Sequence, residues 1–229
     1  MSTFLLVHGA FRGGWSWRRV RPYLVAAGHD VYAPSLTGAG ERAAGAVAGL
    51  ETWVDELVAL VEAEDLDDLV LVGHSQGGVV VRALEARIPA RVRHVVYLDG
   101  AVPDPGERAV DLTPAAGVTL PPRETSIPAR APVAGGDLDE ATAAWMAARL
   151  TPTPFAPSLD ALDVPDEHAG PVSYVFCSGT PDGYPSGTTR ARLDARGTAY
   201  EVIEAGHDAP LTAPRVVADV LMRAAARPA

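Results

Sequence analysis

The sequence contains no lysine: all 19 of its basic residues are arginine, and they face 29 acidic residues for a formal net charge of -10. Without lysine, no side-chain amine is available for a Schiff base, for a lysine general base or for the phosphate-binding lysine of a P-loop. The acidic balance argues against a general nucleic-acid-binding protein. Several mechanisms and one class of partner are therefore excluded at the outset.

Cysteine and long apolar runs are also scarce. Cys177 is the only cysteine, so no internal disulfide can form. No apolar run approaches the length of a bilayer span, and the stretch "MSTFLLVHG" lacks the basic region and cleavage site of a secretory signal. We therefore expect a cytoplasmic protein, a monomer or homodimer, whose partner is a small-molecule substrate rather than a nucleic acid or a membrane.

Short apolar runs alternate with helical patterns along the 229 residues. The predicted strands are Thr3–Val7, His29–Pro34, Asp68–Val72, Val92–Leu98, Val172–Cys177 and Ala199–Ala205. The predicted helices are Trp17–Ala27, Leu50–Glu64, Gln76–Ile88, Thr188–Arg196 and Ala213–Ala226, the last with Thr212 as its N-cap. Most of the apolar runs are continuous, which is typical of strands buried on both faces of a parallel sheet. The alternation predicts an α/β fold whose doubly wound, mostly parallel sheet has about six strands.

Residues 101–170 interrupt this alternation. They are rich in proline and contain one convincing helix, Asp137–Leu150, which opens with the Asp137 and Glu140 pair of a capping-box-like start. Because a structureless loop of this length is uncommon in a compact domain, we predict a small cap inserted over a binding site. The core then comprises residues 1–100 and 171–229. A disordered linker is the alternative, although the segment has large apolar side chains to bury.

The stretch Gly73-His74-Ser75-Gln76-Gly77 fits the pattern G-x-S-x-G between a predicted strand and a predicted helix. In that setting the serine occupies a tight, strained turn that lifts its Oγ above the carboxyl end of the sheet. The neighbouring chain passes so close that Gly73 and Gly77 cannot carry a Cβ. We therefore predict that Ser75 is a nucleophile. An ordinary turn whose serine caps a helix is the alternative.

A serine nucleophile needs a base and a carboxylate that orients the base. Of six histidines, His207 is best placed, between the last predicted strand and the last helix, and His168 is the fallback. Asp182, after the penultimate strand, is the preferred carboxylate because this fold places its acid between the serine and the histidine in the chain. Asp99 is the alternative acid. Asp208 adjoins the histidine, so its side chain diverges and we expect a solvated or capping role.

An oxyanion needs two preorganised N–H donors. The candidates are Gln76, directly after the serine, and Ala10 in "HGAFRGGW" after the first strand. Six side chains are candidates for an apolar pocket, with core packing as the alternative for each: Phe11, Trp15, Trp145, Met146, Phe155 and Tyr184.

The stretch "FLLVHGAFRGGWSWRRVRPYLVAAGHDVYAPSLTGAGER" followed by "LVGHSQGG" resembles the α/β-hydrolase superfamily. The resemblance is closest to the branch of plant methylesterases, hydroxynitrile lyases and small bacterial esterases, and it is weak through residues 101–170. It implies an α/β-hydrolase fold, a Ser-Asp-His triad on Ser75, Asp182 and His207, and no cofactor or metal. The segment "CSGTPDGYP" is longer than the family pattern, which keeps Asp99 as an alternative acid.

The resemblance also separates the possible reactions. Hydroxynitrile lyases of this branch use a threonine after the first-motif histidine and a lysine after the catalytic histidine, where this chain has Gly9 and Asp208. Cyanohydrin cleavage is therefore disfavoured, and we expect a serine esterase that acts through an acyl-enzyme on a small or medium apolar substrate. Two alternatives stay open: a cofactor-free cyclase or lyase of natural-product metabolism that uses the Ser-His pair as a base, and a ligand-binding receptor.

Overall fold

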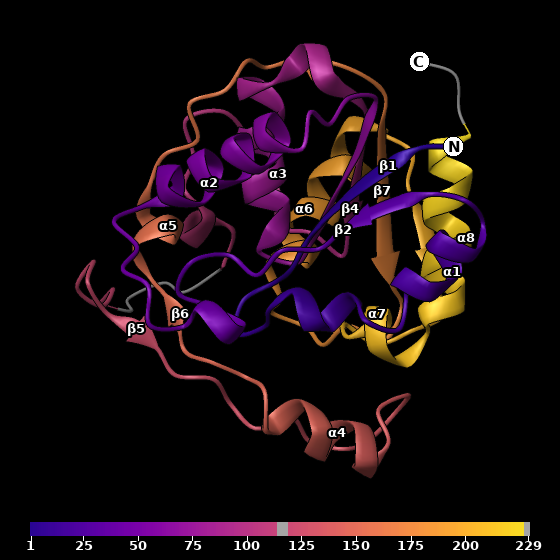
Figure 1. The fold of residues 1–229 in the computed structure, drawn as a ribbon. Coiled ribbons are helices and arrows are strands. Elements are labelled where there is room, and N and C mark those ends of the chain that lie inside the picture. Colours follow the sequence, from indigo (N-terminus) through magenta and orange to yellow (C-terminus); the bar gives the residue numbers. More distant parts are fainter. Residues whose placement is uncertain (114–118, 227–229) are drawn as a thin grey trace.

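A computed structural model describes residues 1–113 and 119–226, and its centre is a six-stranded sheet with helices on both faces (Figure 1). The strand order is β2-β1-β3-β4-β7-β8 and every neighbouring pair is parallel. The strands are β1 (Thr3–Val7), β2 (Asp30–Tyr32), β3 (Leu69–His74), β4 (Val92–Leu98), β7 (Val172–Cys177) and β8 (Glu201–Ile203). The predicted α/β class and the parallel six-stranded sheet are confirmed.

Helices cover both faces of this sheet. Helices α2 (Leu50–Ala63) and α3 (Gly77–Arg87) pack on one face, and α1 (Arg21–Ala26) and α8 (Pro214–Ala225) pack on the other (Figure 1). Strand β1 shows the consequence, because Leu5 lies in the cluster with α2 and α3 while its neighbour Phe4 lies in the cluster with α1 and α8. Both faces need apolar side chains, which explains the continuous apolar runs. No helix of the described residues is long and apolar enough to cross a membrane.

Several helix ends differ from the prediction. The predicted helix Trp17–Ala27 is divided into a 3-10 helix, η1 (Gly14–Trp17), and α1. Helix α6 (Pro185–Arg196) begins earlier than predicted, with Pro185 at the start, where proline is tolerated. Thr212 does not cap the last helix, because it is the final residue of a short helix, α7 (Ala209–Thr212), before α8 begins at Pro214.

Residues 101–170, which we call the β4–β7 segment, form η4 (Ala109–Leu112), α4 (Glu140–Ala147), α5 (Ala156–Leu159) and an antiparallel pair of β5 (Ser126–Ile127) with β6 (Thr153–Pro154). The segment places α4, β5 and β6 near the carboxyl ends of the strands and then runs back to the start of β7 (Figure 1). Its residues 114–118 lie outside the described part. In the remainder, no strand joins the six-stranded sheet. The segment therefore lies where a cap over that edge would lie.

The expected capping box of the segment's helix is wrong. Helix α4 begins at Glu140, and its N-cap is Asp139, whose carboxylate accepts from the backbone N–H of Thr142 at 2.7 Å. Asp137 instead accepts from the backbone N–H of Gly206 at 2.7 Å and from the hydroxyl of Thr212 at 2.6 Å. Asp137 thus joins the β4–β7 segment to the loop that carries the candidate base.

Candidate active site

Ser75 lies in the sharp turn between strand β3 and helix α3. Its φ is +54°, in the left-handed region that side chains rarely adopt. A Cβ on Gly73 would lie 2.5 Å from the carbonyl oxygen of Gly77, and a Cβ on Gly77 would lie 2.5 Å from the carbonyl oxygen of Val7. Both contacts are too short for real atoms, so the expected need for glycine at these two positions is confirmed. The tight turn leaves the Ser75 hydroxyl beside the carboxyl ends of β1 and β3.

The Ser75 hydroxyl belongs to a chain of hydrogen bonds. Its Oγ is 3.0 Å from Nε2 of His207, and Nδ1 of His207 is 2.5 Å from Oδ2 of Asp99. His207 follows β8, and Asp99 follows β4 directly with a φ of +46°. Asp99 also accepts from the hydroxyl of Thr180 at 2.5 Å and from the backbone N–H of Cys177 at 3.4 Å. Three segments that are distant in sequence therefore meet at one point.

The structure pairs His207 with the alternative acid, Asp99, and not with the preferred Asp182. Asp182 is exposed in the loop between β7 and α6. Asp99 lies beside the turn that carries Ser75 because β4 is the neighbour of β3 in the sheet, and the backbone N–H of Ser75 donates to the carbonyl of Leu98 at 3.2 Å. The order Ser, Asp, His along the chain is the same for either aspartate, so chain order could not separate them.

Electrostatics favours an ionised Asp99. Burial by itself raises the pKa of this carboxyl, but the hydrogen bond and charge of His207 and the hydrogen bond of Thr180 outweigh it, so the pKa lies below its ordinary value. An ionised carboxylate accepts a hydrogen bond from the N–H at Nδ1 of His207. Nε2 is then left as the acceptor that faces the Ser75 hydroxyl.

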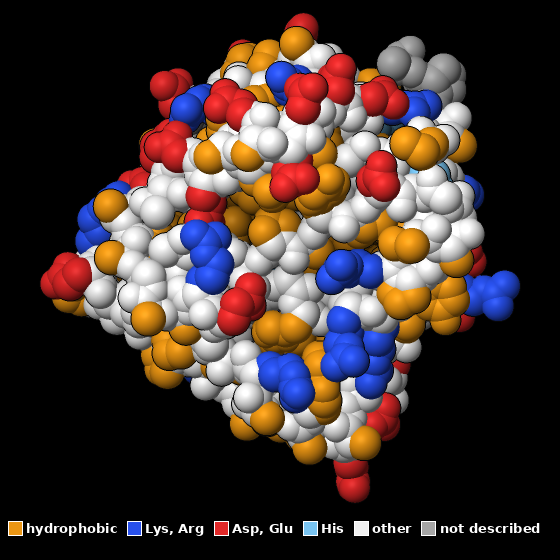
Figure 2. Space-filling model, viewed as in Figure 1, with side chains coloured by type: hydrophobic (Ala, Val, Ile, Leu, Met, Phe, Trp, Pro, Cys, Tyr) orange, Lys and Arg blue, Asp and Glu red, His pale blue; other side chains and the backbone are white. Residues whose placement is uncertain are grey.

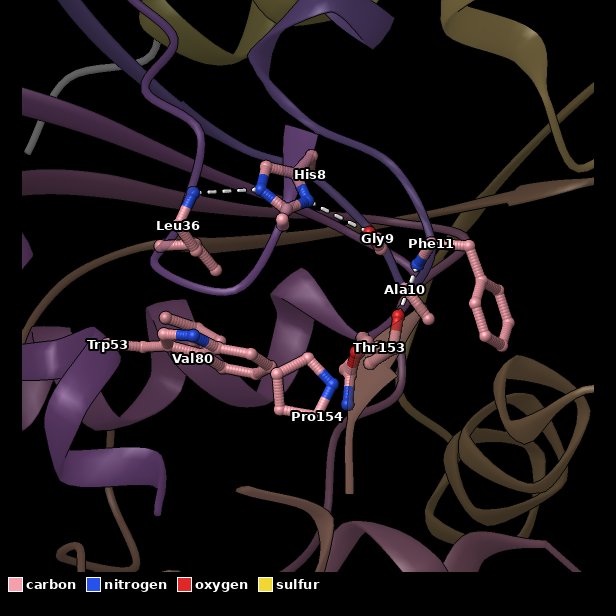
Figure 3. A pocket seen from close by; sticks show the side chains of 11 residues that line it. His8, Gly9, Ala10, Phe11, Leu36, Trp53, Val80, Thr153 and Pro154 are labelled. Carbon is pink, nitrogen blue, oxygen red and sulfur yellow. Dashed lines mark hydrogen bonds between the residues drawn. The ribbon is translucent and has the colours of Figure 1, made fainter. Parts of the chain in front are cut away.

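Two further histidines are buried and neutral at this edge of the sheet. Burial lowers the pKa of His74 to about 3 and that of His8 to about 4. Nε2 of His74 donates to the backbone carbonyl of His207 at 2.8 Å. Nε2 of His8 accepts from the backbone N–H of Leu36 at 3.0 Å, and its Nδ1 donates to the carbonyl of Gly9 at 2.9 Å (Figure 3). Both side chains therefore brace the loops around Ser75.

His168, the fallback base, belongs to a different cluster. Its Nδ1 is 2.8 Å from Oε2 of Glu85, a fully buried carboxylate that also pairs with Arg82 at 3.2 Å. This cluster joins helix α3 to the end of the β4–β7 segment, and His168 does not line the cavity at Ser75. The structure brings His207 to the serine, as the first choice of base required.

The two predicted oxyanion donors lie beside Ser75. Ala10 and Gln76 line the same cavity as the serine, and Gln76 is the N-cap of α3. The loop of Ala10 passes so near that a Cβ on Gly9 would lie 2.8 Å from Cβ of Ser75. Within residues 1–113 and 119–226, neither backbone N–H donates to a protein acceptor. Two donors are thus available for a developing negative charge.

A cavity of about 900 Å³ opens at Ser75 and His207. Four of the six predicted pocket residues line it: Phe11, Met146, Phe155 and Tyr184. The ring centroids of Tyr184 and His207 lie 4.4 Å apart. The β4–β7 segment contributes further apolar wall, including Val110, Ile127 and Leu138. A mainly apolar organic molecule would fit such a site.

The other two predicted pocket residues lie outside the cavity. Trp15 and Trp145 pack edge to face with ring centroids 5.3 Å apart, and neither lines the cavity. The guanidinium groups of Arg18 and Arg149 lie over the Trp145 ring, at 5.2 and 4.2 Å from its centroid. Arginine side chains gather on the lower part of the face in Figure 2, where α4 lies, and acidic ones gather on the upper part. The tryptophans therefore attach α4 to the core rather than hold a ligand.

An ion pair missed by the sequence analysis also borders the cavity. Nε of Arg12 donates to Oδ1 of Asp208 at 2.7 Å, and both residues line the cavity. Burial by itself raises the pKa of Asp208, but the charge of Arg12 helps to hold it below the ordinary value. Asp208 is therefore a paired residue rather than a solvated one, and although it occupies the N-cap position of α7, its side chain makes no capping hydrogen bond. Across the described residues, no group of three or more His, Cys, Asp or Glu side chains could hold a metal ion.

Comparison with known proteins agrees with this architecture. Residues 4–220 match the model of the Alpha/beta hydrolase family. The carbendazim hydrolyzing esterase of Nocardioides sp. is 45% identical over 124 residues, which cover 53% of this chain and 50% of that protein. Salicylic acid-binding protein 2 of Nicotiana tabacum is 38% identical over 104 residues, which cover 44% and 40%. The matches thus span half or less of the length of these curated relatives.

Solved structures match over nearly the whole chain. An extracellular alpha/beta-hydrolase from a Paenibacillus species, described as sharing structural and functional homology with tobacco Salicylic Acid Binding Protein 2, superposes with a TM-score of 0.79. It is 25% identical, and the match covers 99% of this chain and 100% of that one. Polyneuridine aldehyde esterase superposes with a TM-score of 0.76 at 21% identity, covering 97% and 98%, which shows a common fold.

Proposed function

Because this chain belongs to the alpha/beta hydrolase family and has its fold, we propose that it is a serine esterase that cleaves carboxylic esters through an acyl-enzyme. The observation that carries the proposal is the chain of hydrogen bonds from Ser75 through His207 to Asp99 at the edge of an apolar cavity. Relatives named as esterases support the same chemistry.

In the proposed first step, Oγ of Ser75 attacks the ester carbonyl carbon while Nε2 of His207 accepts the hydroxyl proton. The carbonyl electron pair moves to oxygen, and the backbone N–H groups of Ala10 and Gln76 stabilise the negative charge. The ionised Asp99 stabilises the imidazolium that has formed. The tetrahedral intermediate then collapses, the C–O bond breaks, and His207 returns the proton to the leaving alcohol.

The second step is hydrolysis of the acyl-enzyme. Nε2 of His207 accepts a proton from a water molecule, whose oxygen attacks the acyl carbon, and the same two N–H groups stabilise the second oxyanion. Collapse breaks the bond to Oγ of Ser75, which recovers its proton from His207, and the carboxylic acid leaves. Apart from the ester and one water molecule, no group outside the chain is needed for the atoms and charges to balance.

The cavity supports a proposal about the substrate. Its apolar wall, supplied largely by the β4–β7 segment, suits a small or medium substrate with a mainly apolar acyl or alcohol group. We propose that residues 101–170 act as a cap that selects this substrate. We also propose a cytoplasmic monomer or homodimer, consistent with the single cysteine, Cys177, which is buried and free.

The nucleophile is tested directly by Ser75→Ala, with Ser178→Ala as the control because Ser178 is an exposed serine that does not line the cavity. We expect Ser75→Ala to lose turnover of short p-nitrophenyl esters and labelling by a fluorophosphonate probe while its circular dichroism spectrum stays unchanged. Ser178→Ala should retain both activities. An active Ser75→Ala variant would rule out the proposal, and labelling of the wild type without turnover of any ester would favour a non-hydrolytic Ser-His reaction.

A further inference from the structure

We propose that Thr153, in the β4–β7 segment, is a positioning residue that holds the oxyanion-binding loop in its working shape. The inference rests on the proposed esterase function. Thr153 lies on strand β6 and is 7% exposed. Its importance follows from one strained residue in the loop, from the contacts that hold that residue, and from the rigid setting of the threonine.

The strained residue is Phe11, directly after the candidate oxyanion donor Ala10. Its φ is +67°, in the left-handed region, although it is not a glycine. Backbone strain of this kind persists only where surrounding contacts hold it, and it occurs most often at functional sites. The loop therefore needs an external support to keep Ala10 in place.

The β4–β7 segment supplies that support through both polar groups of the Phe11 backbone. The hydroxyl oxygen of Thr153 accepts from the N–H of Phe11 at 2.5 Å (Figure 3). The backbone N–H of Thr151 donates to the carbonyl of Phe11 at 3.0 Å. A segment more than a hundred residues away in the sequence thus replaces water as the partner of the strained residue.

The peptide unit between Ala10 and Phe11 is also held at its other end. Nη1 of Arg12 donates to the carbonyl oxygen of Ala10 at 2.9 Å, and Arg12 is itself paired with Asp208, next to the candidate base. The carbonyl and the N–H of one peptide plane are therefore bound by two different partners. The N–H of Ala10 lies in the adjoining Gly9–Ala10 plane, and the two planes meet at Cα of Ala10. A shift of the held plane would therefore displace this Cα and the N–H attached through it, and Thr153 opposes that shift from the side of the β4–β7 segment.

Thr153 can act as an anchor because it is fixed itself. Its neighbour Pro154 lines a small cavity together with Trp53 and Val80 (Figure 3). The cavity between these side chains has a volume of about 10 Å³, no more than one water molecule requires. A Cβ on Gly38 would lie 2.6 Å from Cγ of Pro154, so the chain on the other side is in close contact too. On the side of Trp53 and Gly38, strand β6 therefore has no room to move, although its other side borders the large cavity.

The contact should act on the transition state more than on substrate binding. The N–H of Ala10 matters most when the carbonyl oxygen acquires its charge, so misplacing it removes stabilisation that appears mainly in the transition state. Misplacement of a catalytic group by about 1 Å can cost about a hundredfold in rate. Loss of the Thr153 hydroxyl should therefore lower kcat and leave KM nearly unchanged.

The test is Thr153→Val, which keeps the shape of the side chain and removes the acceptor. We expect kcat for a p-nitrophenyl ester to fall by about 10- to 100-fold, with KM within about threefold of wild type. Thr153→Ser, which restores the hydroxyl, should recover kcat to within about threefold. If Thr153→Val does not fold, Thr153→Ala removes the same acceptor and carries the same prediction.

The matched control is Thr189→Val. Thr189 is 3% exposed and accepts from the backbone N–H of Val102 at 3.1 Å, which is the same kind of contact, but it does not line the cavity at Ser75. Its loss should leave kcat unchanged. Equal losses of kcat in both variants, an unchanged kcat in Thr153→Val, or a rise in KM alone would overturn the proposal for Thr153. Absence of ester turnover in the wild type would instead overturn the proposed function.

Discussion

Asp99 combines burial, backbone strain and contact with the candidate base in a single residue. Its side chain is 2% exposed, its φ is positive, and its two carboxylate oxygens accept from His207, Thr180 and Cys177. A carboxylate held by several donors stays ionised and keeps its orientation. In the proposed mechanism this charge faces the imidazolium that forms when Ser75 loses its proton.

Asp99→Asn tests the role of this charge, because it replaces the carboxylate by a neutral amide of nearly the same shape. We expect kcat to fall by about 10⁴-fold, because a neutral amide neither stabilises the imidazolium nor enforces the tautomer that leaves Nε2 of His207 free. Asp182→Asn is the control, since Asp182 is exposed in its loop, and it should stay within about twofold of wild type. Steady-state kinetics with a p-nitrophenyl ester measures kcat for both variants. A large loss of kcat confined to Asp182→Asn would show that Asp182, and not Asp99, is the triad acid.

At the scale of elements, the junction of β3 with α3 depends on close backbone contact. Gly73 touches the first turn of α3, and Gly77 touches the end of β1, so the helix begins directly against the sheet. This contact explains how the turn between β3 and α3 holds Ser75 in a strained conformation, because the helix and the two strands leave Ser75 no other position. Glycine at these positions is needed for space, since neither has a positive φ.

Gly77→Ala should therefore destabilise the protein. The added Cβ would lie 2.5 Å from the carbonyl oxygen of Val7 and 2.8 Å from that of His8, and such overpacking costs about 1–3 kcal/mol. The control is Gly187→Ala in α6, where a Cβ meets nothing within 4 Å and alanine should stabilise the helix by about 0.4–1 kcal/mol. Urea unfolding measures both changes. Equal stability of the two variants would show that the junction can relax.

Elements with a long, continuous apolar run could be predicted from the sequence, and elements of two to four residues could not. The apolar runs of β1, β3 and β4 are buried on both faces, so their patterns are unambiguous, and the end of each run lies close to the end of its strand. Strands β5 and β6 have two residues each and helix α7 has four, which is too short for any periodicity. The local sequence favours Asp137 as a helix cap, because nothing in it indicates the distant partners Gly206 and Thr212.

The residues of the candidate site also fall into two groups, those that the local sequence identifies and those that depend on distant contacts. Ser75 and Gln76 come from a motif with fixed spacing, and His207 comes from its place after the last strand, so local sequence identifies all three. The pairing of Arg12 with Asp208 and of Thr153 with Phe11 joins residues that are far apart in the chain. Such pairs depend on tertiary packing, and a single sequence carries no signal for them.

At the scale of the whole molecule, two buried neutral histidines make stability depend on pH. The pKa of His8 is lowered to about 4 and that of His74 to about 3, whereas both are near 6.5 in the unfolded chain. Between these values the unfolded chain binds more protons than the folded protein. Their contribution to stability is therefore fully present above pH 6.5 and is lost as the pH falls toward the folded values.

We expect the free energy of unfolding to fall between pH 6.5 and 4 by about 1.4 kcal/mol per pH unit for each of these histidines. Urea unfolding at pH 7, 6 and 5 measures the slope. His74→Gln keeps an N–H donor for the carbonyl of His207 and removes one titrating group, so it should lower the slope by about half of this contribution. An unchanged slope in that variant would show that His74 does not carry the effect.

The order of the three site segments along the chain has a consequence for biosynthesis. Ser75 and Asp99 directly follow the adjacent strands β3 and β4, which are complete within the first hundred residues, but His207 follows β8, the last strand of the sheet to be translated. A nascent chain that has already paired β3 with β4 carries only an ordinary serine hydroxyl, because its base has not yet been made. In the proposed enzyme, reactivity toward esters therefore begins only after the sheet is complete, so an unfinished chain could not acylate itself in the cell.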